Sequence, residues 1–204
     1  MRLQIIEKRY LETSAGQIHL HLSKNRSKPP LILLHQTASS SEMYKGMIEH
    51  LQDKFWCIAP DMMGFGQSAK PAGLDTPISQ HASLFWECLD QIGIKECLIF
   101  GHHTGASVGL QMAHDRPESV SKLALSGPRL LTEAQIEHFR NGLLPVKLDP
   151  AGDFLLDTWN RLRQKDPTAS LELTLREALL TIQAGDCYPR SEEHTSELQS
   201  RSDL

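Results

Sequence analysis

The chain has 204 residues, with 21 Lys and Arg against 25 Asp and Glu, and its formal net charge is −4. This length suits one domain with a hydrophobic core, and the mildly acidic balance argues against a nucleic-acid-binding protein. The sequence contains no apolar run close to the roughly 18 residues that a membrane-spanning helix needs, and its first residues lack the apolar segment of a signal peptide. The four cysteines show no CxxC spacing, so we expect reduced, buried thiols in a cytoplasmic protein.

The first predicted elements are β-strands and one helix. Residues 9–22 show the pattern of a β-hairpin, with turn residues at 14–17 followed by alternating apolar positions. Short continuous apolar runs at 31–34 and 55–59 predict two buried parallel strands. Between these runs, residues 44–51 carry apolar side chains at helical spacing, after three serines that can cap a helix.

The alternation of strand and helix continues along the chain. Apolar residues recur at spacings of four and three over 78–92, which predicts a helix with Thr76 as its N-cap and Pro77 at its first position. Three more elements follow in order: a strand at 97–100, a helix at 105–114 and a strand at 120–125. A hairpin followed by alternating strands and helices predicts an α/β fold, with a mostly parallel sheet and helices on both faces.

Beyond residue 128 the pattern contains helices only. Asp-Pro pairs at 149–150 and 166–167 mark where two helices begin. The first helix carries the apolar stripe Leu155, Trp159 and Leu162, and the second carries Leu171, Leu175, Leu179 and Ile182. Such stripes are more often packing faces than membrane faces, so we expect these side chains to pack over the sheet.

The last fifteen residues differ from the rest of the chain. Residues 190–204 are polar and show neither helical nor strand periodicity. Residues 190–200 resemble the translation, in one reading frame, of a widely used sequencing adapter. We therefore interpret 190–204 as a non-native, disordered tail, and we expect the natural protein to continue past Pro189.

Polar loops follow three of the predicted strands, in the segments 33–37, 60–68 and 99–105. Open α/β sheets place their sites at the carboxyl ends of strands. The second loop reads Asp-x-x-Gly-x-Gly-x-Ser from residue 61, and the third reads Gly-His-His-Thr-Gly from residue 101. In order and spacing the three loops resemble the α/β-hydrolase superfamily, in its esterase, epoxide-hydrolase and dehalogenase-like branch.

The resemblance implies an α/β-hydrolase core at 1–128, a truncated helical cap at 129–189, and a tail at 190–204. Members of the family have two more strands after the cap, which bring the catalytic acid and His. This chain lacks both, so we expect the fragment to be inactive. The family's strand order also leaves the strand at 120–125 on an open sheet edge, from which we expect poor solubility.

By this resemblance, residues 101–105 are the nucleophile elbow, a sharp turn from a strand into a helix with glycines on both sides. The central residue is His103, where the family has Ser, Asp or Cys. Three interpretations of His103 remain open: a nucleophile or general base in altered chemistry, a pocket residue in a protein that has lost hydrolysis, or a structural histidine. Its position in the motif favours the first two.

A second Gly-x-Ser-x-Gly pattern is centred on Ser107. The motif has its chemical meaning only where a strand turns into a helix, and the apolar run ends at Phe100. Ser107 then lies one helical turn beyond His103. We expect Ser107 to be a small residue that packs against the sheet.

The resemblance also suggests the remaining site residues. The backbone N–H groups of Thr104 and Thr37 would form the oxyanion hole. His35, Gln36 and His102 would lie at the substrate pocket, with Gln36 in place of the family's usual Gly. For His35 we prefer the interpretation that it anchors its loop.

We therefore expect an α/β-hydrolase-fold protein whose parent hydrolyses a small uncharged ester- or amide-like substrate beneath a helical cap. The alternative is a ligand-binding or scaffold member that has lost its nucleophile. No cofactor is expected, because Gly64-x-Gly66 is not followed by the helix of a dinucleotide site. Metal binding by His35, His102, His103 and Asp61 is not expected, because the histidines lack ligand spacing. The partner is a small molecule, and the sequence does not specify the oligomeric state.

Overall fold

The computed structural model describes residues 6–70, 76–128 and 146–185. Its strands are β1 (Ile6–Thr13), β2 (Gly16–Ser23), β3 (Pro30–Leu34), β4 (Trp56–Pro60), β5 (Cys97–His102) and β6 (Val120–Ser126). Its helices are α1 (Lys45–Leu51), α2 (Ile78–Gln91), α3 (Thr104–Asp115), α5 (Asp153–Lys165) and α6 (Leu171–Ala184), with 3-10 turns η1 (Ser41–Tyr44) and η2 (Pro117–Ser119). The expected tail at 190–204 lies outside the described residues.

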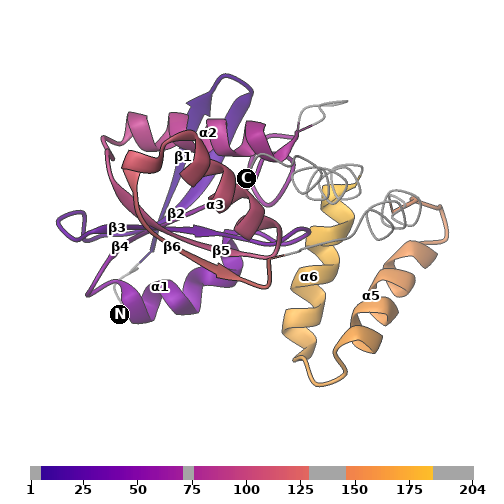
Figure 1. Cartoon of the computed structure of the whole chain (residues 1–204). Coiled ribbons are helices and arrows are strands. Elements are labelled where there is room, and N and C mark those ends of the chain that lie inside the picture. The colour runs from indigo at the N-terminus through magenta and orange to yellow at the C-terminus, as the bar shows by residue number, and fades with distance from the viewer. Residues whose placement is uncertain (1–5, 71–75, 129–145, 186–204) are drawn as a thin grey trace.

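The strands form one sheet in the order β1-β2-β4-β3-β5-β6. The β1–β2 hairpin is antiparallel and β2 pairs with β4 in the same sense, whereas β3, β4, β5 and β6 pair in parallel. Helix α1 lies on one face of the sheet, and α2 and α3 lie on the other (Figure 1). The predicted α/β fold with a mostly parallel sheet is thus confirmed.

Successive side chains of the parallel strands point to opposite faces of the sheet, so the hydrophobic core consists of two clusters, one on each face. In β3, Leu31 and Leu33 belong to a small cluster with Tyr44 and Ile48 beneath η1 and α1. The neighbours on the same strand, such as Ile32, contact the larger cluster under α2 and α3. Because both faces are covered, the strand reads as a continuous apolar run rather than as an alternating one.

Two local predictions require correction. Strand β5 runs to His102, two residues past its expected end, because Gly101 and His102 pair with the end of β6. Helix α2 begins at Ile78, and Pro77 is its N-cap in an extended conformation with no side-chain cap. Thr76 therefore does not cap this helix.

Helices α5 and α6 form a pair beside the sheet, which we call the α5–α6 pair (Figure 1). The expected packing of its leucines over the sheet is wrong for most of them, since Leu155, Leu171, Leu175 and Leu179 are 45–64% exposed. The pair instead buries small side chains: Thr158, Thr174, Ala178, Thr181 and Ala184. Small residues allow helices to approach closely, and the leucines point outward.

The turn between the two helices is held by Arg163. Its guanidinium donates hydrogen bonds to the carbonyl oxygens of Pro167 and Ala169. At the start of α6, Ser170 accepts a hydrogen bond from the N–H of Leu173 and so caps the helix. These contacts fix the α5–α6 pair as a unit.

Strand β6 is at the edge of the sheet within the described residues, and its Leu125 is 38% exposed. An open edge pairs readily with other chains, and a lysine on it opposes such pairing. We predict that Leu125→Lys reduces self-association, measured by light scattering over a range of protein concentrations. The control is Leu110→Lys, because Leu110 is 39% exposed on α3, away from the edge. Equal association of both variants and the parent chain would contradict this prediction.

Candidate functional site

The turn from β5 into α3 has a strained backbone. His103 has φ 54° and ψ −115°, and among the described residues it is the non-glycine residue with positive φ. Such a conformation costs on the order of 1–3 kcal/mol and persists only where the surrounding structure enforces it. The imidazole therefore stands at the bend, between the last residue of the strand and the first of the helix.

Glycines on both sides of His103 allow the bend. A Cβ on Gly105 would overlap the backbone of Leu34 and His35, and a Cβ on Gly101 would overlap the backbone of Gly105. The strand β3, the bend and the first turn of α3 are thus in backbone contact. Ser107 lies in α3 and is buried, so the second glycine–serine pattern is inside the helix.

The side chain of Thr104 connects the bend to the loop after β3. Its hydroxyl lies 2.8 Å from the Thr37 hydroxyl, 3.5 Å from the Thr37 N–H nitrogen and 3.3 Å from His103 Nδ1. Thr104 is fully buried. The structure therefore brings Thr37, Thr104 and His103 together, and the N–H of Thr37 donates weakly to the hydroxyl of Thr104.

His35 does not line the pocket. Its ring is fully buried, and its Nε2 accepts a hydrogen bond from the N–H of Met62 at 2.9 Å. The proton is then on Nδ1, which donates to the carbonyl oxygen of Gln36 at 2.8 Å. Burial lowers the pKa of His35, so the ring stays neutral and joins the first loop to the second.

His102 also lies outside the predicted pocket. Its Nδ1 lies 3.2 Å from both oxygens of Ser126, the backbone carbonyl and the hydroxyl, at the end of β6. Side chains alternate along a strand, so His102 is directed differently from the bend residue that follows it. Of the three predicted pocket residues, only Gln36 lines the cavity described below.

Asp61 organises the loop after β4. Its carboxylate accepts hydrogen bonds from the N–H groups of Ser41 and Gln67 at 2.6 and 2.8 Å, and it bonds His19 Nδ1 at 2.9 Å. Burial alone would raise the pKa of Asp61, but these hydrogen bonds outweigh it and hold the pKa well below its usual range. A Cβ on Gly66 would overlap this carboxylate, which explains the glycine in the motif.

His19 and His21, on β2, complete this buried cluster and were not anticipated from the sequence. Their rings meet edge to face with centroids 4.7 Å apart, and His21 Nδ1 lies 2.7 Å from the Ser41 hydroxyl. Burial lowers the pKa of His21 to about 4. The two histidines alternate with the apolar residues of β2, so apolar periodicity assigns them to an exposed face, whereas both faces of this strand are buried.

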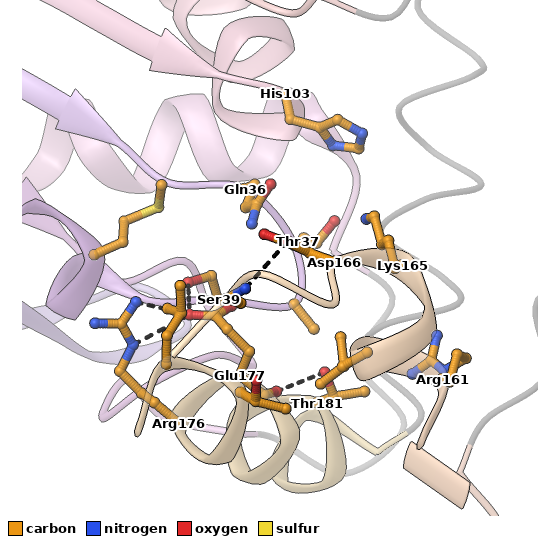
Figure 2. Close-up of a pocket in the computed structure, with 16 residues that line it drawn as sticks. Gln36, Thr37, Ser39, His103, Arg161, Lys165, Asp166, Arg176, Glu177 and Thr181 are labelled. Atoms are coloured by element: carbon orange, nitrogen blue, oxygen red, sulfur yellow. Dashed lines mark hydrogen bonds and ion pairs between the residues drawn. The ribbon is translucent and has the colours of Figure 1, made fainter. Parts of the chain in front are cut away.

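A cavity of about 670 Å³ opens between the bend and the α5–α6 pair (Figure 2). The core contributes Gln36, Thr37, Ala38, Ser39, Met43 and His103. The helical pair contributes Arg161, Leu162, Lys165, Asp166, Ala169, Leu173, Thr174, Arg176, Glu177 and Thr181. His103 thus faces a space of the size that small-molecule sites have.

Glu177 links the two sides of this cavity. Its carboxylate accepts a hydrogen bond from the Ser39 hydroxyl at 3.3 Å and pairs with the adjacent Arg176 at 3.0 Å. Outside the cavity lining, Lys70 Nζ donates a hydrogen bond to the carbonyl oxygen of Gln183 on α6 at 3.2 Å. Arg176 and Glu177 are not part of any motif, so the sequence offered no signal for them.

The described residues contain no helix long and apolar enough to cross a membrane. They also contain no group of three His, Cys, Asp or Glu side chains that could hold a metal ion.

The chain is similar to several known proteins. Residues 29–183 match the family model described as the alpha/beta hydrolase fold. Haloalkane dehalogenase 2 of Mycobacterium bovis is 32% identical over 124 residues, which are 61% of this chain and 43% of that protein. The chain thus spans less than half the length of the curated relatives it matches.

Solved structures share the fold at low sequence identity. Epoxide hydrolase CorEH superposes with a TM-score of 0.74 at 21% identity, over 97% of this chain and 78% of that chain. N-acyl homoserine lactonase AidH superposes with a TM-score of 0.67 at 22% identity, over 96% and 70%.

The close approach of glycines around His103 can be tested by stability. We predict that Gly105→Ala destabilises the chain by about 3 kcal/mol, because the new methyl group would overlap backbone that cannot move aside. Chemical denaturation measures this difference. Gly46→Ala is the matched control, since a Cβ there meets nothing within 4 Å and alanine favours helix α1. Similar stability of both variants would contradict the proposed backbone contact.

The buried histidine cluster predicts a dependence of stability on pH. The folded pKa of His21 is depressed, so below the unfolded value of 6.5 the unfolded chain takes up a proton that the folded chain does not. Stability therefore falls as the pH drops from 6.5 to about 4, by roughly 1.4 kcal/mol per pH unit for this group. Below pH 4, protonation of Asp61 adds to the loss, because its pKa is also depressed.

We predict that His21→Gln lowers the slope of the unfolding free energy against pH between pH 6.5 and 4, by the amount that corresponds to about one bound proton. The measurement is urea denaturation at a series of pH values, with the same substitution at exposed His50 as the control. An unchanged slope in His21→Gln would show that His21 does not stay neutral in the folded state.

The family model match over residues 29–183, together with the observed sheet, shows that the chain belongs to the α/β-hydrolase fold family.

Proposed function

We propose that this chain is part of a hydrolase of small ester- or amide-like substrates, in which His103 stands at the attacking position. The observation that carries the proposal is the backbone of His103, with φ 54° at the bend between β5 and α3. In this fold the bend presents one side chain to the substrate. The cavity of about 670 Å³ that His103 lines would receive the substrate.

An imidazole at this position can carry hydrolysis as a general base. Its unprotonated nitrogen takes a proton from a water molecule while the water oxygen attacks the carbonyl carbon. The bond to the leaving oxygen or nitrogen then breaks, and the imidazolium returns the proton to that atom. The same ring serves both steps, so no hydroxyl nucleophile is needed at the bend.

The negative charge on the carbonyl oxygen requires donors. The N–H groups of Thr104 and Thr37 are proposed for this role, as the first turn of α3 and the loop after β3 bring these residues together. The helix N-terminus at Thr104 also favours negative charge there. We further propose that the α5–α6 pair is the part of a cap that covers the site.

The relatives support this class of reaction. Their names describe a haloalkane dehalogenase, an epoxide hydrolase and an N-acyl homoserine lactonase. All three names denote cleavage of a bond in a small organic molecule. The lactonase name makes a carbonyl substrate the natural first choice.

A second candidate is a member of the fold that binds a small ligand without hydrolysing it. The specific observation in its favour is the contact between the Thr37 N–H and the Thr104 hydroxyl. In that arrangement the protein's own hydroxyl takes the place of a developing oxyanion. The two candidates share the cavity and differ in whether His103 performs chemistry.

We predict that the longer protein of which this chain is part hydrolyses p-nitrophenyl acetate, and that His103→Ala in that protein lowers the rate about a hundredfold, the lower end of a general-base contribution. Spectrophotometric release of nitrophenolate measures the rate. Ser107→Ala is the control, because Ser107 lies buried within α3 and should leave the rate unchanged. Equal rates for that protein with and without the His103→Ala substitution, with ligand binding intact, would favour the second candidate instead.

A further inference from the structure

The charged residues of the cavity are unevenly distributed. The core side contributes no Lys, Arg, Asp or Glu, while the α5–α6 pair contributes three cations and two acids: Arg161, Lys165, Arg176, Asp166 and Glu177. The lining therefore carries a formal charge of +1 within a chain whose net charge is −4. The positive charge lies on the α5–α6 wall, across the cavity from the bend.

Both acids are already engaged by the protein. Glu177 pairs with Arg176 and accepts the Ser39 hydrogen bond. Asp166 accepts hydrogen bonds from the N–H and the hydroxyl of Thr168 and from the N–H of Ala169, at 2.7–3.1 Å. These carboxylates close the turn between the helices and hold α6 against the core, and Asp166 also offsets part of the neighbouring positive charge.

Arg161 and Lys165 are in a different situation. They are four residues apart on α5 and so share one face of the helix. Neither forms a hydrogen bond or an ion pair with any residue in the described ranges, whereas Arg163 between them donates to two carbonyl oxygens. Figure 2 shows both side chains on the same side of the cavity, with His103 above them.

Stabilisation of the helix dipole explains only part of this arrangement. Basic side chains in the last turn of a helix are favourable, and Lys165 is in the last turn of α5. The effect falls off within one turn, and Arg161 is a full turn earlier. A guanidinium and an ammonium on one wall of a cavity are the groups that recognise a carboxylate.

Resting on the proposed function, we propose that the ligand of this cavity carries a carboxylate at one end, bound by Arg161 and Lys165, and a neutral ester or amide carbonyl at the other end, near His103. The ligand class is thus a half-ester or half-amide of a small dicarboxylic acid. The wall at the bend has no Lys, Arg, Asp or Glu and so suits the carbonyl, and the cationic wall suits the carboxylate.

The test compares ligands that differ only in charge. The monoethyl esters of succinate, glutarate and adipate are titrated into the full chain. Each half-ester is compared with its neutral analogue, in which a carboxamide replaces the carboxylate. Isothermal titration calorimetry or ligand-observed NMR gives Kd without any need for turnover. We expect the best half-ester to bind at least about tenfold more tightly than its carboxamide, with the difference shrinking at high salt.

The variant Arg161→Gln/Lys165→Gln should abolish this preference and leave binding of the carboxamide unchanged. Its matched control is Lys54→Gln/Lys95→Gln, which removes two exposed lysines that do not line the cavity. Circular dichroism melts of both double variants check that the fold is retained. The substituted side chains are exposed, so neither variant should unfold.

Three results would overturn the inference: equal binding of charged and neutral ligands, no measurable binding of any half-ester, or a preference that survives in Arg161→Gln/Lys165→Gln. Its failure differs from failure of the proposed function. Ester hydrolysis that depends on His103 but shows no preference for anions contradicts only this inference. Anion-selective binding with no hydrolysis contradicts only the assignment of chemistry to His103.

Discussion

The backbone contact between β3, the bend after β5 and the start of α3 determines the rest of this structure. Gly101 and Gly105 allow three backbone segments to meet with no side chain between them. The approach leaves His103 in a conformation that non-glycine residues rarely adopt. The position of its imidazole is therefore a consequence of packing in the sheet, and the surrounding fold offsets the strain at the bend.

A buried polar network holds the other loops in place around this bend. Asp61 receives backbone and histidine hydrogen bonds, and the neutral ring of His35 ties the second loop to the first. Buried polar groups of this kind are costly unless satisfied, so the network permits few alternative loop arrangements. The cavity then lies between a rigid core and the α5–α6 pair, which meets the core at Glu177 and Ser39.

Much of the core could be predicted from the sequence, because buried parallel strands are short apolar runs and the helices between them have clear periodicity. The bend could be located from its glycines. The roles of His35 and His102 could not, since two polar residues in adjacent loops look alike until their hydrogen-bond partners are known. The exposed leucines of α5 and α6 show the same limit: periodicity identifies a face of a helix but not what covers it. Arg161 and Lys165 line the cavity because of the way the α5–α6 pair lies against the core, and no local sequence pattern indicates that arrangement.

The central claim is that the His103 imidazole faces the ligand cavity, and chemical modification tests it most directly. Diethylpyrocarbonate acylates accessible neutral imidazoles, and peptide mass spectrometry identifies each modified histidine. The account predicts that His103 is modified, that a bound half-ester protects it, and that the buried His19, His21 and His35 do not react. An unreactive His103 in the ligand-free chain, or a reactive His103 that ligand does not protect, would contradict the account.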